Sequence, residues 1–477
     1  MGRIGGMRIG ILVLVVLSWA GVAAAQLPPP VQRILDGHSI PAEDVSVLVR
    51  PVGGGEPVLS HLPAVPRNPA STIKTVTTWV ALATLGPTYY WPTEVFFLGN
   101  YADGALDGDL ALKGFGDPYL VTEEVWKLLR ALRRTGLEDV RGDLVIDDSH
   151  FARVDEDPGA FDSQPFRTYN VLPNALLVNF KAVRFQFLPD HANARVRISA
   201  DPTPSNLAID NRLRLVDGPC RGYQAGVAFD LVDLPIGRRA VFSGSFPAAC
   251  APYSLSRTVL EHDSFTYGVY RTLWAELGGR HRGGLRRGVV PQDVEPALTW
   301  RSRPLAEIIR SVNKFSNNVM TRQLLHTLGV ERDGPPGTAT SGIAVINEYF
   351  EEHGIDRNGL VIDNGAGLSR ATRISADALA DVLVTAARSP LAAEFLASLS
   401  IGGLDGTTRG RFNGHAVSGR MHVKTGRLDH VSALAGLVHA RSGVDYATVV
   451  MVNSPDAHRG PGTELQEALV RWVYELP

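Results

Sequence analysis

Hydrophobic residues near the start of the chain alternate with polar ones before they recur at helical spacing. Valines alternate with other residues over 45–52, and after three glycines a second apolar stretch covers 57–61, which predicts a β-hairpin. From Ser71 to Leu85 the apolar residues recur every three or four positions, and Gly86-Pro87 follows. This spacing predicts a helix that ends at the glycine and the proline.

The pattern changes over residues 88–255, where short apolar runs typical of strands replace the helical spacing. Four such runs cover 95–98, 110–113, 144–146 and 196–198. Glycine, aspartate, asparagine and proline residues separate the runs, as expected of turns between short strands. We therefore predict a β-rich insertion of one or two small modules.

Helical spacing returns after residue 255, and strand patterns follow it. The predicted helices cover 305–312, 319–328, 343–353 and 376–387. A hairpin is predicted over 431–453, and a last helix begins at Thr463. Strands near both ends with helices between them predict an α/β (α+β) domain, made of residues 26–87 and 256–477 and split by the insertion.

The first 25 residues have the order of charge and hydrophobicity of a secretory signal. Arg3 and Arg8 precede an apolar run from Ile9 to Leu17, and small residues end the segment at Ala25. The apolar run is far shorter than the roughly 20 residues that a membrane span needs. We therefore expect residues 1–25 to be removed on export, leaving a periplasmic or extracytoplasmic protein without an integral membrane span.

The charge balance gives no sign of a nucleic-acid partner. The chain has 47 basic and 49 acidic side chains, a formal net charge of −2, whereas a nucleic-acid surface needs an excess of positive charge. Six of the basic residues are lysines, namely Lys74, Lys113, Lys127, Lys181, Lys314 and Lys424. Because lysine is scarce, a lysine inside a motif is more informative than in an average chain.

The chain has two cysteines, Cys220 and Cys250. In an oxidising compartment they are expected to form a disulfide that closes a loop of about thirty residues, worth roughly 3 to 4 kcal/mol by loop entropy. Two buried free thiols are the alternative. The 13 histidines and two cysteines show no H-E-x-x-H or paired C-x-x-C spacing, so we expect neither a metal nor another cofactor.

Ser71 and Lys74 lie three residues apart in the first predicted helix and therefore on the same face. A serine nucleophile needs a base, and a lysine amine can serve only if burial or a nearby cation lowers its pKa well below about 10.4. Arginine could not replace it, because guanidinium keeps its proton. Taken alone, the S-x-x-K spacing also fits a solvated lysine on an amphipathic helix.

Two further motifs complete a set. Ser316-Asn317-Asn318 lies between predicted helices, and Lys424-Thr425-Gly426 precedes a predicted strand. The order S-x-x-K, S-x-N, K-T-G resembles the motif set of penicillin-binding proteins and serine β-lactamases. Taken alone, the S-x-N motif also fits a helix N-cap, but two of only six lysines occupy the required positions.

Nearly all of the mature sequence resembles the class C penicillin-binding proteins, the D-alanyl-D-alanine carboxypeptidase/endopeptidase family. Besides the three motifs, the resemblance is carried by Gly114-Phe115-Gly116-Asp117-Pro118, Leu144-Val145-Ile146-Asp147, Tyr169-Asn170, Ser243-Gly244-Ser245, Asn313-Lys314, Gly367-Leu368-Ser369-Arg370 and Asp405-Gly406-Thr407. In that family a transpeptidase-like domain, with an antiparallel sheet and helices, is interrupted after the nucleophile helix by two small domains. This agrees with the insertion predicted over 88–255.

The resemblance implies an acyl-enzyme mechanism. Ser71 would attack the carbonyl of the penultimate D-alanine in a peptidoglycan stem peptide, and Lys74 would take its proton. Ser316 and Lys424 would pass a proton to the leaving amine, while Asn318 would position Lys74 and the substrate amide. β-Lactam inhibitors are implied as ligands because they mimic the scissile bond and acylate the same serine.

The resemblance also implies where the substrate binds. Lys424 and Thr425, in one strand with Gly426, would hold the terminal carboxylate, and the backbone N–H groups of Ser71 and Arg427 would form the oxyanion hole. The family usually has a small residue, often threonine, where Arg427 stands. The side chain at this position is therefore expected to alter the mouth of the site.

The far end of the stem's side chain is implied to meet two charged residues. Arg370 would bind a carboxylate, and Asp147 would bind an ammonium, although a turn-capping role fits Asp147 equally well. The family's usual D-G-S-G-L-S-R run has Asn364 and Ala366 in place of its first acid and its first serine. We therefore expect one polar contact to this end of the substrate to be missing.

Other functions stay open on the sequence alone. A serine β-lactamase or a lysine-activated esterase shares the S-x-x-K chemistry, and rapid turnover of penicillin would favour them. A catalytically silent wall-binding protein is the alternative that is not an enzyme, and intact Ser71, Lys74 and Lys424 argue against it. The sequence does not decide whether the enzyme trims terminal D-alanine, cuts cross-links or does both.

Overall fold

The computed structural model describes residue 2, residues 27–220 and residues 226–477. The predicted signal segment, residues 1–25, lies outside the described residues apart from Gly2. In the described part of the chain, none of the helices is both long enough and apolar enough to cross a membrane.

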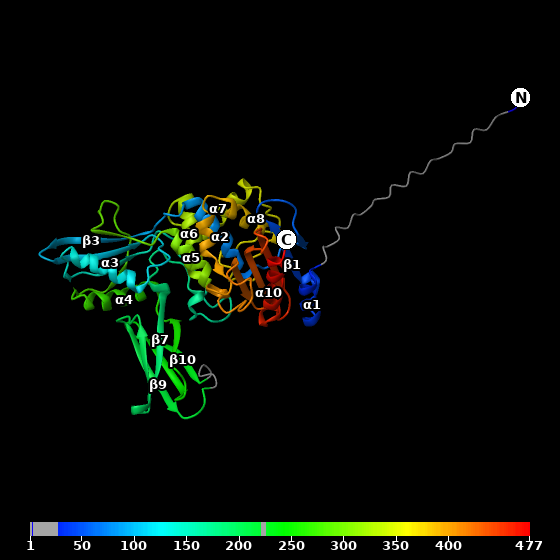
Figure 1. Ribbon diagram of the computed structural model, residues 1–477. Coiled ribbons are helices and arrows are strands. Elements are labelled where there is room, and N and C mark those ends of the chain that lie inside the picture. The colour runs from blue at the N-terminus through cyan, green and yellow to red at the C-terminus, as the bar shows by residue number, and fades with distance from the viewer. Residues whose placement is uncertain (1, 3–26, 221–225) are drawn as a thin grey trace.

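A six-stranded antiparallel sheet is the centre of one half of the molecule (Figure 1). In spatial order its strands are β16 (Ser400–Ile401), β17 (Met421–Leu428), β18 (Val431–His439), β19 (Asp445–Asn453), β1 (Val45–Pro51) and β2 (Leu59–His61). Every residue of β18 before His439 is buried. A strand buried on both sides requires a layer of helices on each face of its sheet.

Helices cover both faces of this sheet. One face packs against α1 (Pro29–His38) and α10 (Pro461–Tyr474), which share a hydrophobic cluster with Val47 and Val49 of β1. Leu48 between them belongs to the cluster on the opposite face, as the two-residue period of a strand requires. That face is covered by α2 (Lys74–Leu85), α5 (Leu305–Phe315), α6 (Asn318–Asp333), α7 (Ala339–Glu352), α8 (Ala376–Arg388) and α9 (Ala392–Ser398).

Two further sheets lie between α2 and α5 in the chain. The first contains β13 (Arg280–His281), β5 (Asp139–Val140), β4 (Ala105–Gly114), β3 (Pro92–Ala102), β15 (Leu298–Arg301), β6 (Leu144–Asp147) and β14 (Leu285–Arg287). The second contains β10 (Val227–Asp233), β11 (Arg238–Pro247), β9 (Leu207–Val216), β8 (Arg195–Asp201), β7 (Ala182–Asp190) and β12 (Tyr253–Thr258). Residues from both sheets share one hydrophobic cluster with α3 (Thr122–Arg134) and α4 (His262–Glu276).

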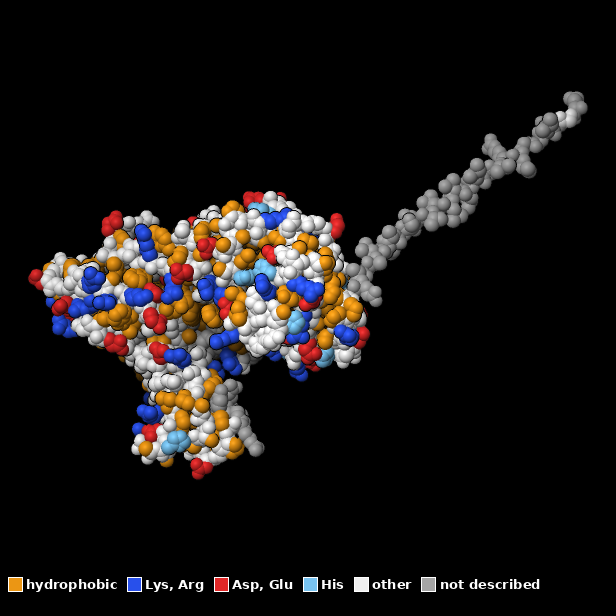
Figure 2. Space-filling model, in the orientation of Figure 1, with side chains coloured by type: hydrophobic (Ala, Val, Ile, Leu, Met, Phe, Trp, Pro, Cys, Tyr) orange, Lys and Arg blue, Asp and Glu red, His pale blue; other side chains and the backbone are white. Residues whose placement is uncertain are grey.

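The second sheet forms a lobe, residues 182–258, that projects from the body of the molecule (Figure 2). The first sheet, with α3 and α4, lies beside the helices that cover the six-stranded sheet (Figure 1). The site described below is therefore carried by the half that holds the central sheet, while the insertion approaches it from one side.

The first sheet extends past residue 255, where the sequence pattern placed the end of the insertion. β15 pairs with β3, with Leu298 opposite Val95, and β13 and β14 pair with β5 and β6. We therefore propose that the insertion covers about residues 88–301 and that the second catalytic segment begins near α5. β13, β14 and β15 have only two to four residues each, which is too short to produce a periodic pattern.

Candidate active site

Ser71 and Lys74 lie at the start of the buried helix α2. Ser71 belongs to a 3-10 turn, η2 (Ala70–Ile73), that leads directly into α2. Ala70 has a φ of 45°, in the left-handed region that residues with a Cβ rarely adopt. Lys74 is fully buried, and its Nζ lies 3.0 Å from Ser71 Oγ. The strained turn thus presents the serine hydroxyl to the amine one turn further along.

The other contacts of Lys74 indicate which protonation state fits the site. Its Nζ lies 2.7 Å from Asn318 Oδ1 and also contacts the carbonyl oxygen of Ala366. Both of these oxygens can only accept hydrogen bonds, whereas the Ser71 hydroxyl can also donate one. A neutral amine has two N–H donors and one lone pair. The two N–H groups fit the two acceptors, which leaves the lone pair facing the Ser71 O–H.

The S-x-N motif lies at the junction of α5 and α6. Ser316 ends α5 with a φ of 55°, and Asn317 caps α6 by accepting a hydrogen bond from Met320 N at 3.1 Å. Asn318 is the first residue of α6. The N-cap expected from the sequence as an alternative is therefore present, at Asn317. It leaves Ser316 and Asn318 free to face the two lysines.

Lys424 is the second buried lysine of the site. Its Nζ lies 2.8 Å from Ser316 Oγ and 2.8 Å from the carbonyl oxygen of Thr425. Lys424 belongs to β17, and β16 pairs with β17 only at His422 and Val423. Among the described strands, β17 from Lys424 onward pairs on one side only, with β18.

Gly426 allows β17 to lie directly against the turn that carries the serine. A Cβ at this position would be 2.5 Å from Pro69 O and 3.0 Å from Ser71 N. The first distance is one that real Cβ atoms essentially never show, and the second is tighter than nine in ten real Cβ contacts. The close approach of the strand to the turn therefore requires a glycine. The next residue, Arg427, is exposed and lies at the mouth of the site.

Burial sets the charge of the two lysines. Loss of hydration lowers the pKa of Lys74 well below its usual value, and the positive charge of Lys424 lowers it further. Burial alone lowers the pKa of Lys424 to about 7. The direction of this shift and the hydrogen bonds of Lys74 both favour its neutral form, while Lys424, with a pKa of about 7, is divided between its two forms at neutral pH.

Two motifs without an assigned role in the sequence hold these residues in place. Lys314 is buried and donates to Asp405 Oδ2 at 2.5 Å and to the carbonyl of Leu399 at 2.8 Å. This ion pair, in which the lysine is buried and the aspartate is 34% exposed, ties the end of α5, next to Ser316, to the segment that precedes Thr407. Thr407 Oγ1 in turn accepts from Thr425 Oγ1 at 2.7 Å. The signals were the Asn313-Lys314 and Asp405-Gly406-Thr407 segments, whose contacts a sequence does not reveal.

The loop that contains Asn364 and Ala366 has a different role from the one expected. Asn364 Oδ1 accepts from Ala366 N at 3.0 Å and from Gly367 N at 3.2 Å, which fixes the turn that directs the Ala366 carbonyl toward Lys74. Ala366 is fully buried. Its side chain therefore faces protein, and the hydroxyl absent at this position does not remove a contact on the exposed wall of the pocket.

Arg370 lies at the rim of the site, where its side chain is half exposed. Its Nη2 lies 3.1 Å from Asp429 Oδ2, and its Nη1 donates to the carbonyl of Asp429 at 3.2 Å. Its guanidinium also lies over the Phe161 ring, 4.8 Å from the centroid. The expected carboxylate-binding arginine is thus present, but it already has an acidic partner in this structure.

Asp147 lies apart from these residues, and its position does not support the expected contact with the substrate. It ends β6 in the insertion and is fully buried. Its Oδ1 accepts from Ser149 Oγ at 2.6 Å, and its Oδ2 accepts from Val290 N at 2.9 Å. A carboxylate without exposed surface that is satisfied by its own domain stabilises a turn and cannot meet a ligand.

The insertion contributes a segment to the site that the sequence did not assign. The carbonyl of Tyr169 accepts from Asn318 Nδ2 at 3.4 Å. Tyr169 Oη donates to Asp162 Oδ2 at 2.7 Å, and Asn170 Nδ2 donates to Asp162 Oδ1 at 2.9 Å. The first bond holds the Tyr169-Asn170 segment against α6, and the two bonds to Asp162 fix the shape of the segment. The signal for it was the Tyr169-Asn170 pair in the resemblance.

The two cysteines form a disulfide, and two of the histidines form a cluster with an aspartate. Cys220 and Cys250 form a disulfide in the lobe. Within the described ranges, one group of possible metal ligands lies within 4.8 Å, made of His430, Asp456 and His458. The Nδ1 atoms of both histidines already accept backbone hydrogen bonds, at 3.2 Å and 2.9 Å. We therefore assign no metal to this group.

Comparison with known proteins agrees with the geometry. The family model described as D-Ala-D-Ala carboxypeptidase 3 (S13) matches residues 30–476. The chain belongs to this family. It is 30% identical over 454 residues to a D-alanyl-D-alanine carboxypeptidase of Actinomadura sp., covering 93% of this chain and 83% of that protein. It is 24% identical over 388 residues to the D-alanyl-D-alanine carboxypeptidase DacB of Haemophilus influenzae, covering 80% of each chain.

Solved structures share the fold. The crystal structure of penicillin binding protein 4 (dacB) from Haemophilus influenzae matches with a TM-score of 0.78 and 21% identity, over 94% of this chain and 99% of that one. The predicted family, the mixed fold with inserted domains and the class of serine-type D-Ala-D-Ala peptidase are thereby confirmed. The roles of individual residues go beyond these comparisons.

Proposed function

We propose that this S13-family enzyme hydrolyses the D-Ala-D-Ala end of peptidoglycan stem peptides with Ser71 as nucleophile and Lys74 as base. One observation carries the proposal. Lys74 Nζ lies among Ser71 Oγ, Asn318 Oδ1 and the Ala366 carbonyl, and only the serine hydroxyl can donate to it. A buried neutral amine in this position is a base that is ready to take the Ser71 proton.

The acylation step follows from these positions. Lys74 takes the Ser71 proton while Ser71 Oγ bonds to the carbonyl carbon of the penultimate D-alanine. The backbone N–H groups of Ser71 and Arg427 stabilise the negative charge that develops on the carbonyl oxygen. Gly426 supports this assignment because a Cβ at that position would be 3.0 Å from Ser71 N, so strand and turn are close enough to share one oxygen.

The leaving group departs on the side of the second lysine. Lys424 Nζ lies 2.8 Å from Ser316 Oγ, so a proton can pass through this hydroxyl to the amine of the terminal D-alanine as the C–N bond breaks. The terminal carboxylate binds to Lys424 and Thr425. The proton that Lys74 took from Ser71 replaces the one that Lys424 gave up, so Lys74 is neutral again. Water then attacks the ester and gives a proton to Lys74, which passes it to Ser71 Oγ as the shortened stem leaves.

We propose the same serine as the target of β-lactams and of cross-linked stems. The Haemophilus influenzae penicillin binding protein 4 has been solved in complex with a β-lactam, and that structure matches with a TM-score of 0.75 at 21% identity. A predatory endopeptidase of Bdellovibrio bacteriovorus matches with a TM-score of 0.54 at 16% identity. These matches establish the shared fold. The one-sided pairing of β17 from Lys424 onward supports space for a longer leaving group, because no described strand covers that edge.

We propose that the protein acts outside the cytoplasm. Its substrate class lies there, and the disulfide between Cys220 and Cys250 supports an oxidising compartment. The charge and hydrophobic order of residues 1–25 supports the same location. The amino-terminal sequence of the protein recovered from its own host tests this, with Gln26 expected as the first residue and Met1 as the contrary result.

Release of D-alanine tests the proposed activity. The purified protein is incubated with a short N-acetylated peptide that ends in D-Ala-D-Ala, and free D-alanine is measured. We expect wild type and Ser205→Ala, which alters an exposed serine of the insertion, to release one D-alanine per peptide. Ser71→Ala should release none above the uncatalysed rate. D-Alanine release by folded Ser71→Ala would overturn the assignment.

A further inference from the structure

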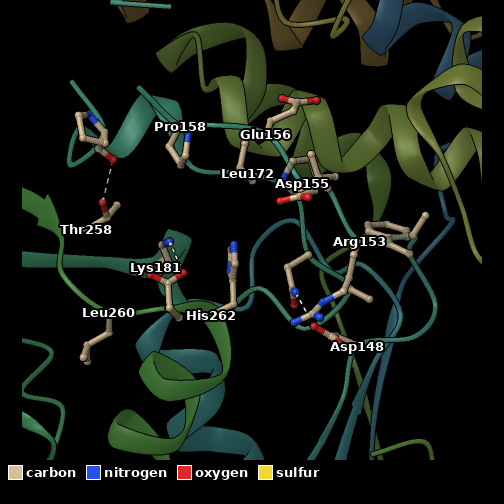
Figure 3. A pocket seen from close by; sticks show the side chains of 18 of the residues that line it. Asp148, Arg153, Asp155, Glu156, Pro158, Leu172, Lys181, Thr258, Leu260 and His262 are labelled. Atoms are coloured by element: carbon tan, nitrogen blue, oxygen red, sulfur yellow. Dashed lines mark hydrogen bonds and ion pairs between the residues drawn. The ribbon is translucent and has the colours of Figure 1, made fainter. Parts of the chain in front are cut away.

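A second cavity lies behind the segment that borders the active site. We call residues 151–175 the wall segment. On one side its Tyr169 carbonyl contacts Asn318. On the other side it borders a cavity of about 480 Å³ (Figure 3), whose opposite side is formed by the ends of η4 (Asn179–Lys181) and β12 and by the start of α4. The proposed mechanism does not use this cavity.

Two side chains at the floor of the cavity, Lys181 and His262, have nitrogen atoms for which no hydrogen bond is present in the described residues. The Lys181 side chain is only 12% exposed, and its nearest acidic oxygen is Glu261 Oε2 at 4.0 Å. Its Nζ makes no hydrogen bond within 27–220 and 226–477. His262 Nε2 is buried and has no hydrogen-bond partner. Figure 3 shows both side chains beside each other, directed toward the part of the wall segment that carries Glu156 and Pro158.

The charges around these two groups favour an anionic ligand. Burial, together with the charge of Lys181, lowers the pKa of His262 to about 3, so its ring is neutral. Arg238 and Arg287 also line the cavity, and each has an acidic partner elsewhere, Asp233 at 2.7 Å and Asp263 respectively. The Asp148 carboxylate on the opposite side accepts from Asn174 Nδ2 at 2.8 Å. Arg153, Asp155 and Glu156 also line the cavity but are exposed, so Lys181 is the mostly buried cation of the lining, and its nearest acidic oxygen is 4.0 Å away.

The cavity shares part of its lining with the rim of the active site. A depression of about 350 Å³ lies beside Arg370 and the loop that follows Asn364. Glu156, Pro158 and Leu172 of the wall segment line both this depression and the cavity. Only these few residues separate the depression beside Arg370 from the cavity, so a substrate that extends past Arg370 would have to pass around them to reach it.

We propose that this cavity is a second substrate site, which binds a carboxylate of the peptidoglycan stem that is cross-linked to the one at Ser71. The inference rests on the proposed function, because it takes peptidoglycan as the substrate. Lys181 supplies the charge and N–H donors, and His262 supplies a neutral ring nitrogen as a further partner. Stem peptides carry several carboxylates, so a cross-linked pair presents one at a distance from the scissile bond.

The test compares a short substrate with a cross-linked one. Lys181→Met keeps the length of the side chain and removes its charge. We expect kcat/KM for the short D-Ala-D-Ala peptide to stay unchanged and kcat/KM for a soluble cross-linked muropeptide dimer to fall about tenfold, the effect of losing one charge-assisted hydrogen bond. Lys127→Met is the matched control, since Lys127 is half exposed on α3 and paired with Glu124. It should change neither value.

Binding to a blocked enzyme provides the second measurement. Wild type acylated with penicillin at Ser71 should still bind the muropeptide dimer by calorimetry, and acylated Lys181→Met should bind it about tenfold more weakly. If Lys181→Met does not fold, His262→Leu replaces it with the same expectation. Equal dimer affinity in both acylated proteins, or equal losses on both substrates in a folded variant, would overturn the second site. Absence of acylation at Ser71 would instead overturn the proposed function.

Discussion

Lys74 resists protonation because its ammonium would be buried and would face Lys424. Burial and the facing charge of Lys424 both lower the pKa of the amine, which favours the neutral form that a base needs. Its two N–H groups are fixed by Asn318 and by the Ala366 carbonyl. The direction of its lone pair is thus set by the surrounding protein before substrate arrives.

We predict that Lys74→Arg abolishes acylation although the positive charge is kept. Guanidinium does not release its proton at any ordinary pH, so Ser71 loses its base. The rate of acylation by a fluorescent penicillin should fall by about 10³-fold, within the range that a general base contributes. Lys127→Arg, on the surface of the insertion, should acylate at the wild-type rate. Acylation of Lys74→Arg near that rate would mean that another group deprotonates Ser71.

The pKa of Lys424 predicts that substrate binding weakens at alkaline pH. Its pKa of about 7 means that the ammonium is present below this pH and is lost as pH rises through it. A substrate with a free terminal carboxylate needs that charge, so kcat/KM should decline above about pH 7. The same peptide with a terminal amide should show a smaller decline, because it loses only the proton that Lys424 passes to the leaving amine and not the charge that binds a carboxylate. A pH profile that is flat from 6 to 9 for the carboxylate peptide would contradict the role given to Lys424.

At the scale of elements, the site depends on how closely β17 lies against η2. We predict that Gly426→Ala lowers kcat/KM by about 10²-fold, because a Cβ 2.5 Å from Pro69 O forces the strand away from Ser71. Thermal unfolding should shift much less than activity, since the displacement is local. Gly53→Ala is the control, as a Cβ there meets nothing within 4 Å. Equal activity of both variants would show that the strand does not position the oxyanion.

The elements predicted from periodicity are those with long amphipathic or alternating patterns. The helices expected at 305–312 and 376–387 correspond to α5 and α8, and the hairpin expected over 431–453 corresponds to β18 and β19. Helix α4 was not predicted, because Gly268 and several aromatic and β-branched residues lower helix propensity within it. It forms because its buried face packs into the insertion core.

Helix α3 was also missed, although its apolar residues Val125, Leu128, Leu129 and Leu132 recur at helical spacing. The strand-like runs on either side favoured a purely β-rich interpretation of the region. The helical spacing of these apolar residues within 122–134 is nevertheless a sufficient signal for a helix.

The candidate site was predictable only where a motif fixes both residue and spacing. The structure brings Ser71, Lys74, Ser316, Asn318 and Lys424 together within hydrogen-bond distances. Asp147 was chosen as an acid in a matching segment, and the sequence could not show that its strand is buried against Val290. The Lys314 to Asp405 ion pair joins residues 91 positions apart, so only the fold reveals it.

At the scale of the whole molecule, the insertion combines a structural lobe with a wall for the active site. The Tyr169 segment reaches α6, whereas the disulfide lies in the lobe between the ends of β9 and β11. Mutations in the lobe and mutations in the Tyr169 segment are therefore expected to have different effects. A change in the lobe should affect stability without affecting the chemistry at Ser71.

We predict that replacing both cysteines with alanine destabilises the lobe by roughly 3 to 4 kcal/mol, the loop entropy of a closure over about 30 residues. Limited proteolysis should then cut within residues 182–258 earlier than in wild type. Hydrolysis of the short D-Ala-D-Ala peptide should keep its wild-type kcat/KM while the protein is intact. A matching loss of peptide hydrolysis would show that the lobe is coupled to the active site.

The position of covalent acylation by penicillin tests the central claim most directly. The intact protein is incubated with penicillin, its mass is measured, and the modified peptide is sequenced by mass spectrometry. We predict one penicilloyl group per chain, on Ser71, and none on Ser71→Ala. Modification at any other residue, or an unmodified wild-type protein that is folded, would contradict the assignment of Ser71 as the nucleophile.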